Sequence, residues 1–278
     1  MLLAVLGALV IGVSLGLMGS GGSILTVPAL IYVIGQDDKI AIAGSLCIVG
    51  VIALVSGARA ALRGQVHWQS VVWFGVPGMF GTFVGAMLGG RVAGSVQVLT
   101  LVLVMVFAGV LMLRQSPSRA LPDAGVPRAP GAPRAAWRIV LDGLLFGTLT
   151  GFVGVGGGFL IVPALVLLGG LSMQRAVGSS LVIIAMQSFT GFAKYHHVLD
   201  DLHVRLDWAV LSTFAGVGVV GSLAGGVLGG RLDQQLLRRV FAVVLLVTAA
   251  AMGVTTVTRV VAASDATVTP GVNSRIGY

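Results

Sequence analysis

The chain has 278 residues, of which 56% are apolar and only 9% are charged, and its mean hydropathy is +1.03. Soluble domains carry about 25% charged residues, so the composition excludes an ordinary soluble domain and predicts a protein embedded in a lipid bilayer. The net charge of +8 comes from arginines and lysines spread between apolar segments. Because no basic face is interleaved with aromatic residues, we expect no nucleic-acid partner.

Two further residue counts exclude particular kinds of catalytic and metal site. The single cysteine, Cys47, excludes an intramolecular disulfide and a cysteine-based metal site. All acidic residues are aspartate, so no paired-glutamate catalytic arrangement exists. The Gly-rich phrases lack the following Lys-Ser/Thr of a phosphate-binding loop. We therefore expect no enzyme and no cofactor.

In chain order, an apolar segment comes first and lacks a basic n-region and an obvious cleavage site. We interpret it as a retained membrane segment and not as a cleaved signal peptide. Further apolar segments follow it, and the predicted set is 2–17, 23–34, 40–58, 68–90, 95–113, 139–153, 157–170, 176–193, 207–230 and 236–261.

A glycine-rich phrase over residues 16–30 interrupts the first hydrophobic stretch and recurs over residues 151–165, with nine of fifteen positions identical. As one helix, residues 2–34 would be about 50 Å long, whereas the hydrocarbon core is about 30 Å thick. The phrase is therefore expected to break the helix, either as a turn between two segments or as the tip of a hairpin that dips into the membrane.

A stretch rich in proline and arginine, residues 114–138, predicts a flexible linker. It separates a first membrane repeat (1–113) from a second (139–261), and a disordered tail (262–278) follows. The halves match beyond the glycine phrase: Gly44-Ser45 recurs as Gly178-Ser179, Gly57 as Gly191, Trp68 as Trp208, and Gly81, Gly85, Gly89, Gly90 and Arg91 as Gly221, Gly225, Gly229, Gly230 and Arg231. Glycines four apart share one helix face, so we assign the last set to helix packing.

These features predict an all-α, polytopic membrane fold of two pseudo-symmetric repeats with 8 to 10 membrane segments. The repeats are inverted if each phrase reverses the chain and parallel if each merely kinks a tilted helix. Both topologies place the same excess of basic residues on the linker side, which predicts a cytoplasmic linker. We favour inversion because of the length of the first stretch and the precedent of inverted transporter repeats.

A duplicated break in two membrane halves is the best sequence pointer to a transporter's binding site. Glycines there leave room for a ligand, and the following helix begins with unpaired N–H groups that suit an anion. The alternative is a tight helix–helix crossing. The predicted substrate-binding residues are Gly19, Ser20, Gly21, Gly22, Ser23, Ser45, Gly154, Gly156, Gly157, Gly158 and Ser179, with Pro28 and Pro163 as helix breaks.

Other polar residues have two interpretations each. Ser45, Ser179, Ser180 and Gln187 either line a solute path or form interhelical hydrogen bonds. Arg59, Arg63 and Lys194 end matching segments and either attract anions into a vestibule or anchor the interface; we propose Arg59 and Lys194 as vestibule residues. The cluster of histidines and aspartates over residues 196–203 is more typical of a solvated loop than of a metal site.

The paired Gly-x-x-Gly-x-Gly-Gly-x-x-x-x-x-Pro phrase, the Gly-Ser pair about 20 residues on and the basic linker resemble the sulfite exporter TauE/SafE family of membrane permeases. Ser23 stands where that family usually has a third glycine. The resemblance covers residues 1–261 and implies a multi-pass carrier of the bacterial inner membrane for small anions such as sulfite, sulfonates or related sulfur compounds.

We therefore expect a secondary transporter or facilitator whose partners are a small anionic solute and the lipid bilayer, and a homo-oligomer is compatible with these features. The alternatives are a carrier of the same fold for a metal ion or a neutral solute, and a membrane enzyme or assembly factor. Intramembrane carboxylates for a cation site are missing, although carbonyls of broken helices remain. Convergent ionisable groups for an enzyme are almost absent.

Overall fold

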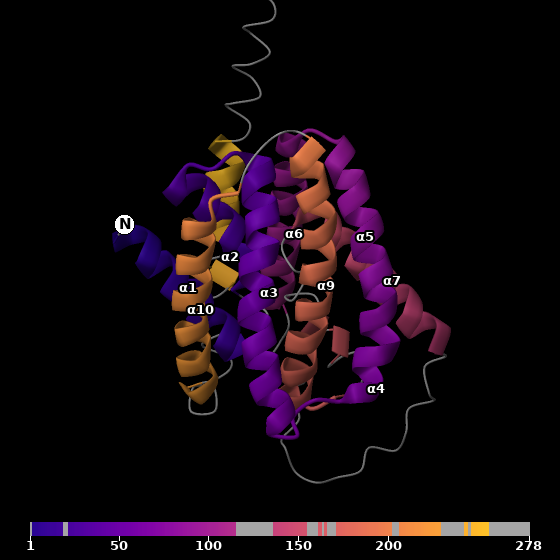
Figure 1. Ribbon diagram of the computed structural model, residues 1–278. Coiled ribbons are helices and arrows are strands. Elements are labelled where there is room, and N and C mark those ends of the chain that lie inside the picture. The colour runs from indigo at the N-terminus through magenta and orange to yellow at the C-terminus, as the bar shows by residue number, and fades with distance from the viewer. Residues whose placement is uncertain are drawn as a thin grey trace, which may run out of the picture.

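The computed structural model describes residues 2–18, 22–114, 136–154, 161–162, 164–165, 171–201, 206–228, 242–243 and 246–255, and their regular structure is entirely helical (Figure 1). The first half contains α1 (Leu2–Met18), α2 (Ser23–Pro28), the π-helix η1 (Ala29–Ile34), α3 (Asp38–Leu62), α4 (Trp68–Ser70), the π-helix η2 (Val71–Gly75), α5 (Val76–Arg91) and α6 (Gly94–Arg114). The second half contains α7 (Ala136–Val153), α9 (Met173–Asp201) and α10 (Trp208–Leu228). The prediction of an all-α fold is confirmed over these residues.

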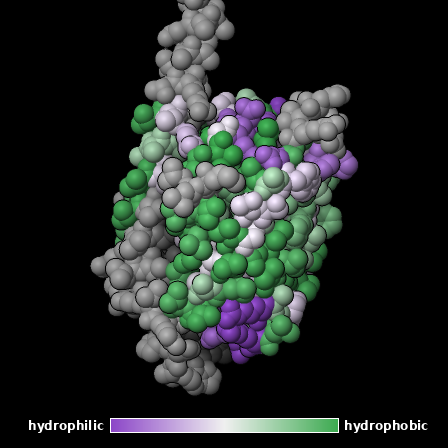
Figure 2. Space-filling view, turned by 60° about the vertical axis from the view of Figure 1, so that its left-hand side comes forward, coloured by the Kyte–Doolittle hydropathy of each residue, from purple (hydrophilic) through white to green (hydrophobic). Residues whose placement is uncertain are grey.

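Four helices of the described part are long and apolar enough to cross a membrane: Asp38–Leu62, Trp68–Arg91, Gln174–His197 and Trp208–Leu228. Shorter apolar helices cover Val5–Leu17, Ser23–Ile34, Gly94–Phe107 and Leu246–Thr255. Figure 2 shows a broad apolar face between hydrophilic patches at its two ends. Trp68, Trp137 and Trp208 lie at helix starts and are each more than half exposed, which is typical of the aromatic belts at a membrane interface.

The starts of two of these helices follow from local capping. The Asp207 carboxylate accepts hydrogen bonds from the backbone N–H groups of Ala209 (2.9 Å) and Val210 (3.2 Å) at the start of α10, which satisfies donors that the helix itself leaves unpaired. At the corresponding place in the first half, His67 Nδ1 accepts from the Ser70 N–H at 3.3 Å.

Helix α1 packs closely and in parallel against α10, although they come from different halves. Gly12 faces the backbone of Gly218, and Gly16 faces the backbone of Ser222, so the residue numbers rise together. A Cβ atom at either glycine would overlap the opposing backbone. These glycines therefore set the distance between the two helices, as small residues do in membrane bundles.

The reciprocal contact joins α5 to α7. Gly143 faces Phe74, and Gly147 faces Gly78, so these two helices are also parallel. Gly81 and Gly85 lie against the α7 backbone, and Gly221 and Gly225 lie against the α1 backbone. The packing role predicted for these four glycines is confirmed, whereas Gly229 and Gly230 lie outside the described residues.

Helices α3 and α9 cross at the centre of the bundle and are antiparallel. Gly191 of α9 faces Leu46 of α3, while Gly57 faces Val182, so one residue number rises as the other falls. Because α10 runs with α3 (Gly218 against Ile52, Gly44 against Leu211) and α5 runs with α9 (Gly75 against Ile183, Gly89 against Tyr195), the long helices form two parallel trios, α1–α10–α3 and α7–α5–α9.

Candidate functional site

The first glycine phrase is described from Gly22 onward, and Gly19, Ser20 and Gly21 lie outside the described residues. Gly22 lies against Ile11 and Leu15, so by this point the chain has doubled back along α1. A Cβ atom at Gly22 would overlap the α1 backbone. The lack of a side chain at Gly22 therefore lets this segment pack against α1, and it does not leave an open space at this position.

The residues after Gly22 form a short helix inside the bundle. Ser23 is fully buried, and the Thr26 hydroxyl donates to the Gly22 carbonyl at 3.3 Å. Helix α2 ends at Pro28, and the wider turns of η1 follow at once. Proline lacks the N–H that would continue the regular hydrogen-bond ladder, and single π turns recur at functional sites.

The second phrase begins at Gly154, directly after α7. This glycine has a φ of +74°, a left-handed conformation that residues with a side chain rarely adopt. Its N–H donates to the Thr150 carbonyl at 2.8 Å, and a Cβ atom would overlap Ile42 of α3. Helix α7 therefore ends at this position because glycine can adopt the left-handed conformation. The other predicted residues of this copy, Gly156, Gly157, Gly158 and Pro163, lie outside the described residues.

Ser45 of the first half meets Gly154 of the second half. The buried Ser45 hydroxyl lies in position to donate to the Gly154 carbonyl and also lies 2.8 Å from the carbonyl oxygen of Ile42. A broken helix leaves carbonyls without partners, and in a membrane interior the protein must supply them. Ser45 thus holds the break in place across the two halves.

A second group of side chains, which was not predicted from the sequence, supports the same break. The Gln97 amide of α6 donates to the Phe152 carbonyl at 2.6 Å and to the Tyr195 hydroxyl, which in turn donates to Phe152 at 3.2 Å. Gln97 and Tyr195 are both fully buried. A glutamine inside the apolar segment 95–113 was the sequence signal for this network.

Ser179 occupies a different environment from Ser45, its counterpart. The Ser179 hydroxyl accepts a hydrogen bond from the His67 backbone N–H at 2.8 Å, and neighbouring Gly178 packs against Gln65. Ser179 therefore lies at the end of the bundle where α3 finishes and α9 begins, and joins the loop between α3 and α4 to α9.

The two proposed vestibule residues lie at opposite ends of the bundle. The half-buried Arg59 guanidinium, near the end of α3, donates to the Leu223 carbonyl at 2.8 Å. The Lys194 ammonium, near the end of α9, lies 5.7 Å from the centre of the Phe83 ring. Because α3 and α9 are antiparallel, these two cations cannot line the same vestibule.

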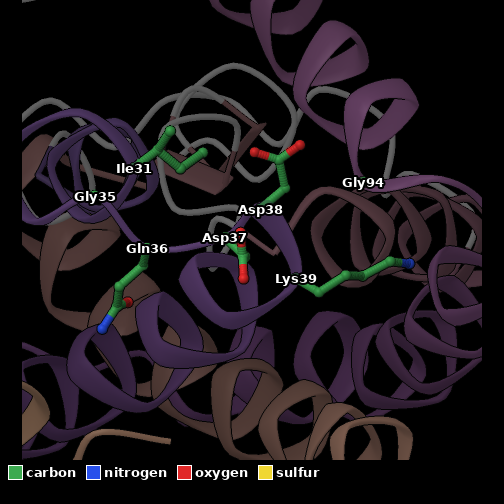
Figure 3. Close-up of a pocket in the computed structure, with 7 residues that line it drawn as sticks. All are labelled: Ile31, Gly35, Gln36, Asp37, Asp38, Lys39 and Gly94. Carbon is green, nitrogen blue, oxygen red and sulfur yellow. The ribbon is translucent and has the colours of Figure 1, made fainter. Parts of the chain in front are cut away.

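The starts of α3 and α9 carry cavities of different charge. A cavity of about 410 Å³ at the start of α3 is lined by Ile31, Gly35, Gln36, Asp37, Asp38, Lys39 and Gly94 (Figure 3). Lys39 points away from the two carboxylates (Figure 3) and donates to the carbonyls that end α5, including Val92 at 2.6 Å. Lys39 therefore caps a helix C-terminus.

The other cavity, of about 550 Å³, lies at the start of α9 and is lined by Arg63, Gly64, Gln65, Leu171, Ser172, Gln174 and Arg175. Both arginines are exposed. Since α7 and α9 run the same way, this cavity shares an end of the bundle with the start of α7, where the 114–138 linker joins. The cavity at the linker end is thus lined by two arginines, and the cavity at the opposite end by two aspartates and Lys39.

Comparison of the sequence with known proteins finds one matching family and several membrane relatives. The profile described as "Sulfite exporter TauE/SafE" matches residues 4–252. A probable membrane transporter protein of Xylella fastidiosa is 36% identical, over 86% of this chain and 89% of its own. The probable membrane transporter protein YunE of Bacillus subtilis is 26% identical, over 84% and 89%.

A third relative is longer. The probable membrane transporter protein MamO of Magnetospirillum gryphiswaldense is 29% identical over 91% of this chain, which corresponds to 44% of its own length. No solved structure matches. These names indicate membrane transport and not an enzyme. The duplicated glycine phrases, the apolar helices and the profile match agree, and the chain belongs to the sulfite exporter TauE/SafE family.

Proposed function

We propose that the chain is a secondary transporter or facilitator that moves a small anion, such as sulfite, a sulfonate or a related sulfur compound, across the bacterial inner membrane. The observation that carries the proposal is the buried break at Gly154, held by Ser45 of the other half. Non-helical backbone at membrane depth is tolerated where it is buried in protein or lines a wet cavity, and such breaks form the binding sites of transporters.

The helix directions support inverted repeats. Helices α1, α3 and α5 correspond to α7, α9 and α10, and the members of each pair belong to opposite trios. The contacts α1–α10 and α5–α7 exchange when the halves are exchanged. In this proposal the halves are related by a pseudo-two-fold axis in the membrane plane, and alternating access is a rocking of one trio against the other.

The basic cavity supports an anionic solute. Arg63 and Arg175 line the linker end, and the positive-inside rule assigns that end to the cytoplasm. Two exposed arginines raise the local concentration of anions without holding them tightly. The Ser and Gly composition of the phrases then supplies uncharged hydrogen-bond donors deeper in the protein.

The first experiment replaces the central glycine of each phrase. Gly21→Val and Gly156→Val should abolish sulfite flux in proteoliposomes while the protein still inserts, because valine fills the space that a solute needs. Gly216→Val is the matched control, since nothing lies within 4 Å of that position. Wild-type flux in both phrase variants would assign the duplicated phrase to scaffolding.

The second experiment tests sidedness. In a Cys47→Ser background, a cysteine at Ala124 in the linker should resist an impermeant thiol reagent added outside intact cells and react after permeabilisation. Rapid labelling in intact cells would place the linker outside and reverse the proposed orientation.

The alternative is transport of a metal ion or a neutral solute by the same fold. The cavity lined by Asp37 and Asp38 favours it, because carboxylates attract cations. Competition separates the two: excess sulfonate should suppress tracer sulfite flux, whereas divalent cations should not.

A further inference from the structure

Two neighbouring polar side chains in the middle of α9 have no hydrogen-bond partner in the part of the chain that the structure describes. Gln187 and Ser188 are both 0% exposed, and neither the amide oxygen and nitrogen of Gln187 nor the Ser188 hydroxyl makes a hydrogen bond to a described residue. Buried polar groups are nearly always paired, and an unpaired one in a native protein requires an explanation such as a water or another ligand. Three orphan atoms on successive residues point to a shared cause.

Their position is the centre of the molecule. Gln187 is the central residue of the 29-residue helix α9, about 21 Å from either end at 1.5 Å per residue. Ser188 faces Gly50, the central residue of α3. The pair therefore lies where the two antiparallel helices of the two halves cross, and transporters of inverted repeats bind their substrates at that level.

Packing alone does not require an amide at this place. The Gln187 amide lies against Gly78 of α5, whereas the counterpart of Gly78, Gly218 of α10, is faced by the aliphatic side chain of Ile52. Ile52 is also 0% exposed. The same helix junction is thus filled by hydrocarbon in one trio and by an unsatisfied amide in the other.

We propose that Gln187 and Ser188 form a solute-binding station at the middle of the transport path. This inference rests on the proposed function. The amide N–H₂ and the hydroxyl supply three uncharged donors, which match the oxygens of a small oxyanion. Since none of the described lysines and arginines is buried beside them, they bind the anion weakly enough to release it.

The direct test compares Gln187→Met with Ile52→Met in the full-length protein. Both introduce the same apolar side chain at equivalent junctions. Gln187→Met should reduce initial sulfite flux, normalised to folded protein, about tenfold, the effect of losing one hydrogen bond of about 1.4 kcal/mol. Its unfolding temperature should equal or exceed that of the wild type, because an orphan amide is removed. Ile52→Met should transport within about twofold of the wild type.

Two results would overturn the station. One is wild-type flux in Gln187→Met. The other is a fall in unfolding temperature that accounts for its lost flux, because the amide would then be structural.

A solute-independent readout separates this inference from the proposed function. In a Cys47→Ser background, Ser188→Cys should react with iodoacetamide at least about tenfold faster than Ala53→Cys, which lies at the apolar position matching Gln187 and is also 0% exposed. Equal, slow labelling means a dry site and refutes the station. Fast labelling of Ser188→Cys in a protein that moves neither sulfite nor methanesulfonate supports the station and refutes the anion assignment.

Discussion

The two helix trios, α1–α10–α3 and α7–α5–α9, share their glycine contacts but differ in what fills their centres. In each trio a glycine near the middle of the first helix, Gly12 or Gly147, meets the backbone of its neighbour. In the first trio Ile52 fills the junction, and in the second Gln187 fills it without a hydrogen-bond partner among the residues that the structure describes. The duplicated scaffold has kept its spacing while its chemistry has diverged.

The difference teaches how to separate packing from function in a duplicated membrane protein. A feature present in both trios, such as the glycine contacts, is needed to bring helices together. A feature present in one trio, such as the buried amide, is not needed for the shared packing and is therefore a candidate for a functional role. The ends of the bundle follow the same division, with arginines at one cavity and aspartates at the other.

The largest effect should come from breaking the shared scaffold. Gly12→Val and Gly147→Val each place a side chain inside the backbone of the neighbouring helix. Each should lower stability by about 3 kcal/mol or more, the upper range for overpacked cores, and the two losses should be similar. The measurement is the fraction of folded, monodisperse protein recovered in detergent. Gly7→Val, with open space around it, is the control, and a normal yield from either interface variant would contradict the equivalence.

The next effect distinguishes the two junctions. Gly78→Ala displaces the Gln187 amide, and Gly218→Ala displaces the end of Ile52. Both should cost about 1–3 kcal/mol of stability. Only Gly78→Ala should also reduce normalised anion flux about tenfold, because only there is a donor moved. Equal flux in the two variants, measured in proteoliposomes at matched protein content, would mean that the junctions do not differ in function.

Smaller losses should follow removal of the paired serines. Ser45→Ala leaves the buried Gly154 carbonyl without its donor and should lower stability by about 1–2 kcal/mol. Ser179→Ala frees the His67 N–H at an end of the bundle, where water can replace the hydroxyl, and should cost less. Thermal unfolding in detergent measures both, and a larger loss for Ser179→Ala would reverse this ranking.

The smallest effect concerns the basic cavity. Replacing both Arg63 and Arg175 by glutamine should slow anion flux about two- to threefold at low ionic strength, since steering by exposed charge is weak and screened. The defect should shrink in 0.5 M salt, because the Debye length is then only about 4 Å and exposed charges are screened. A defect of equal size at both salt concentrations would indicate direct binding and not steering.

Particular residues show which contacts could be predicted from the sequence and which could not. The glycine stripe at Gly81 and Gly85 was correctly assigned to packing, because spacing along one helix is a local property. One of the two interpretations of Ser45 was that it lines a solute path. In the structure its hydroxyl donates to the Gly154 carbonyl, so a role in a solute path stays a prediction. Gln97 and Tyr195 were missed because their common partner, the Phe152 carbonyl, is identified only by proximity in space.

The sequence by itself determined the helical class, the membrane environment, the family and the duplicated glycine phrases, since each depends on composition or on residues close together along the chain. Arginine counts left the relative direction of the halves open, because both topologies place the same residues on the linker side. Only the tertiary structure decided that α1 pairs with α10 and α5 with α7, that α3 and α9 run in opposite directions, and that Gln187 is buried with no hydrogen bond to any described residue. These are contacts between residues far apart in the chain, and they depend on how closely the glycines let the helices approach.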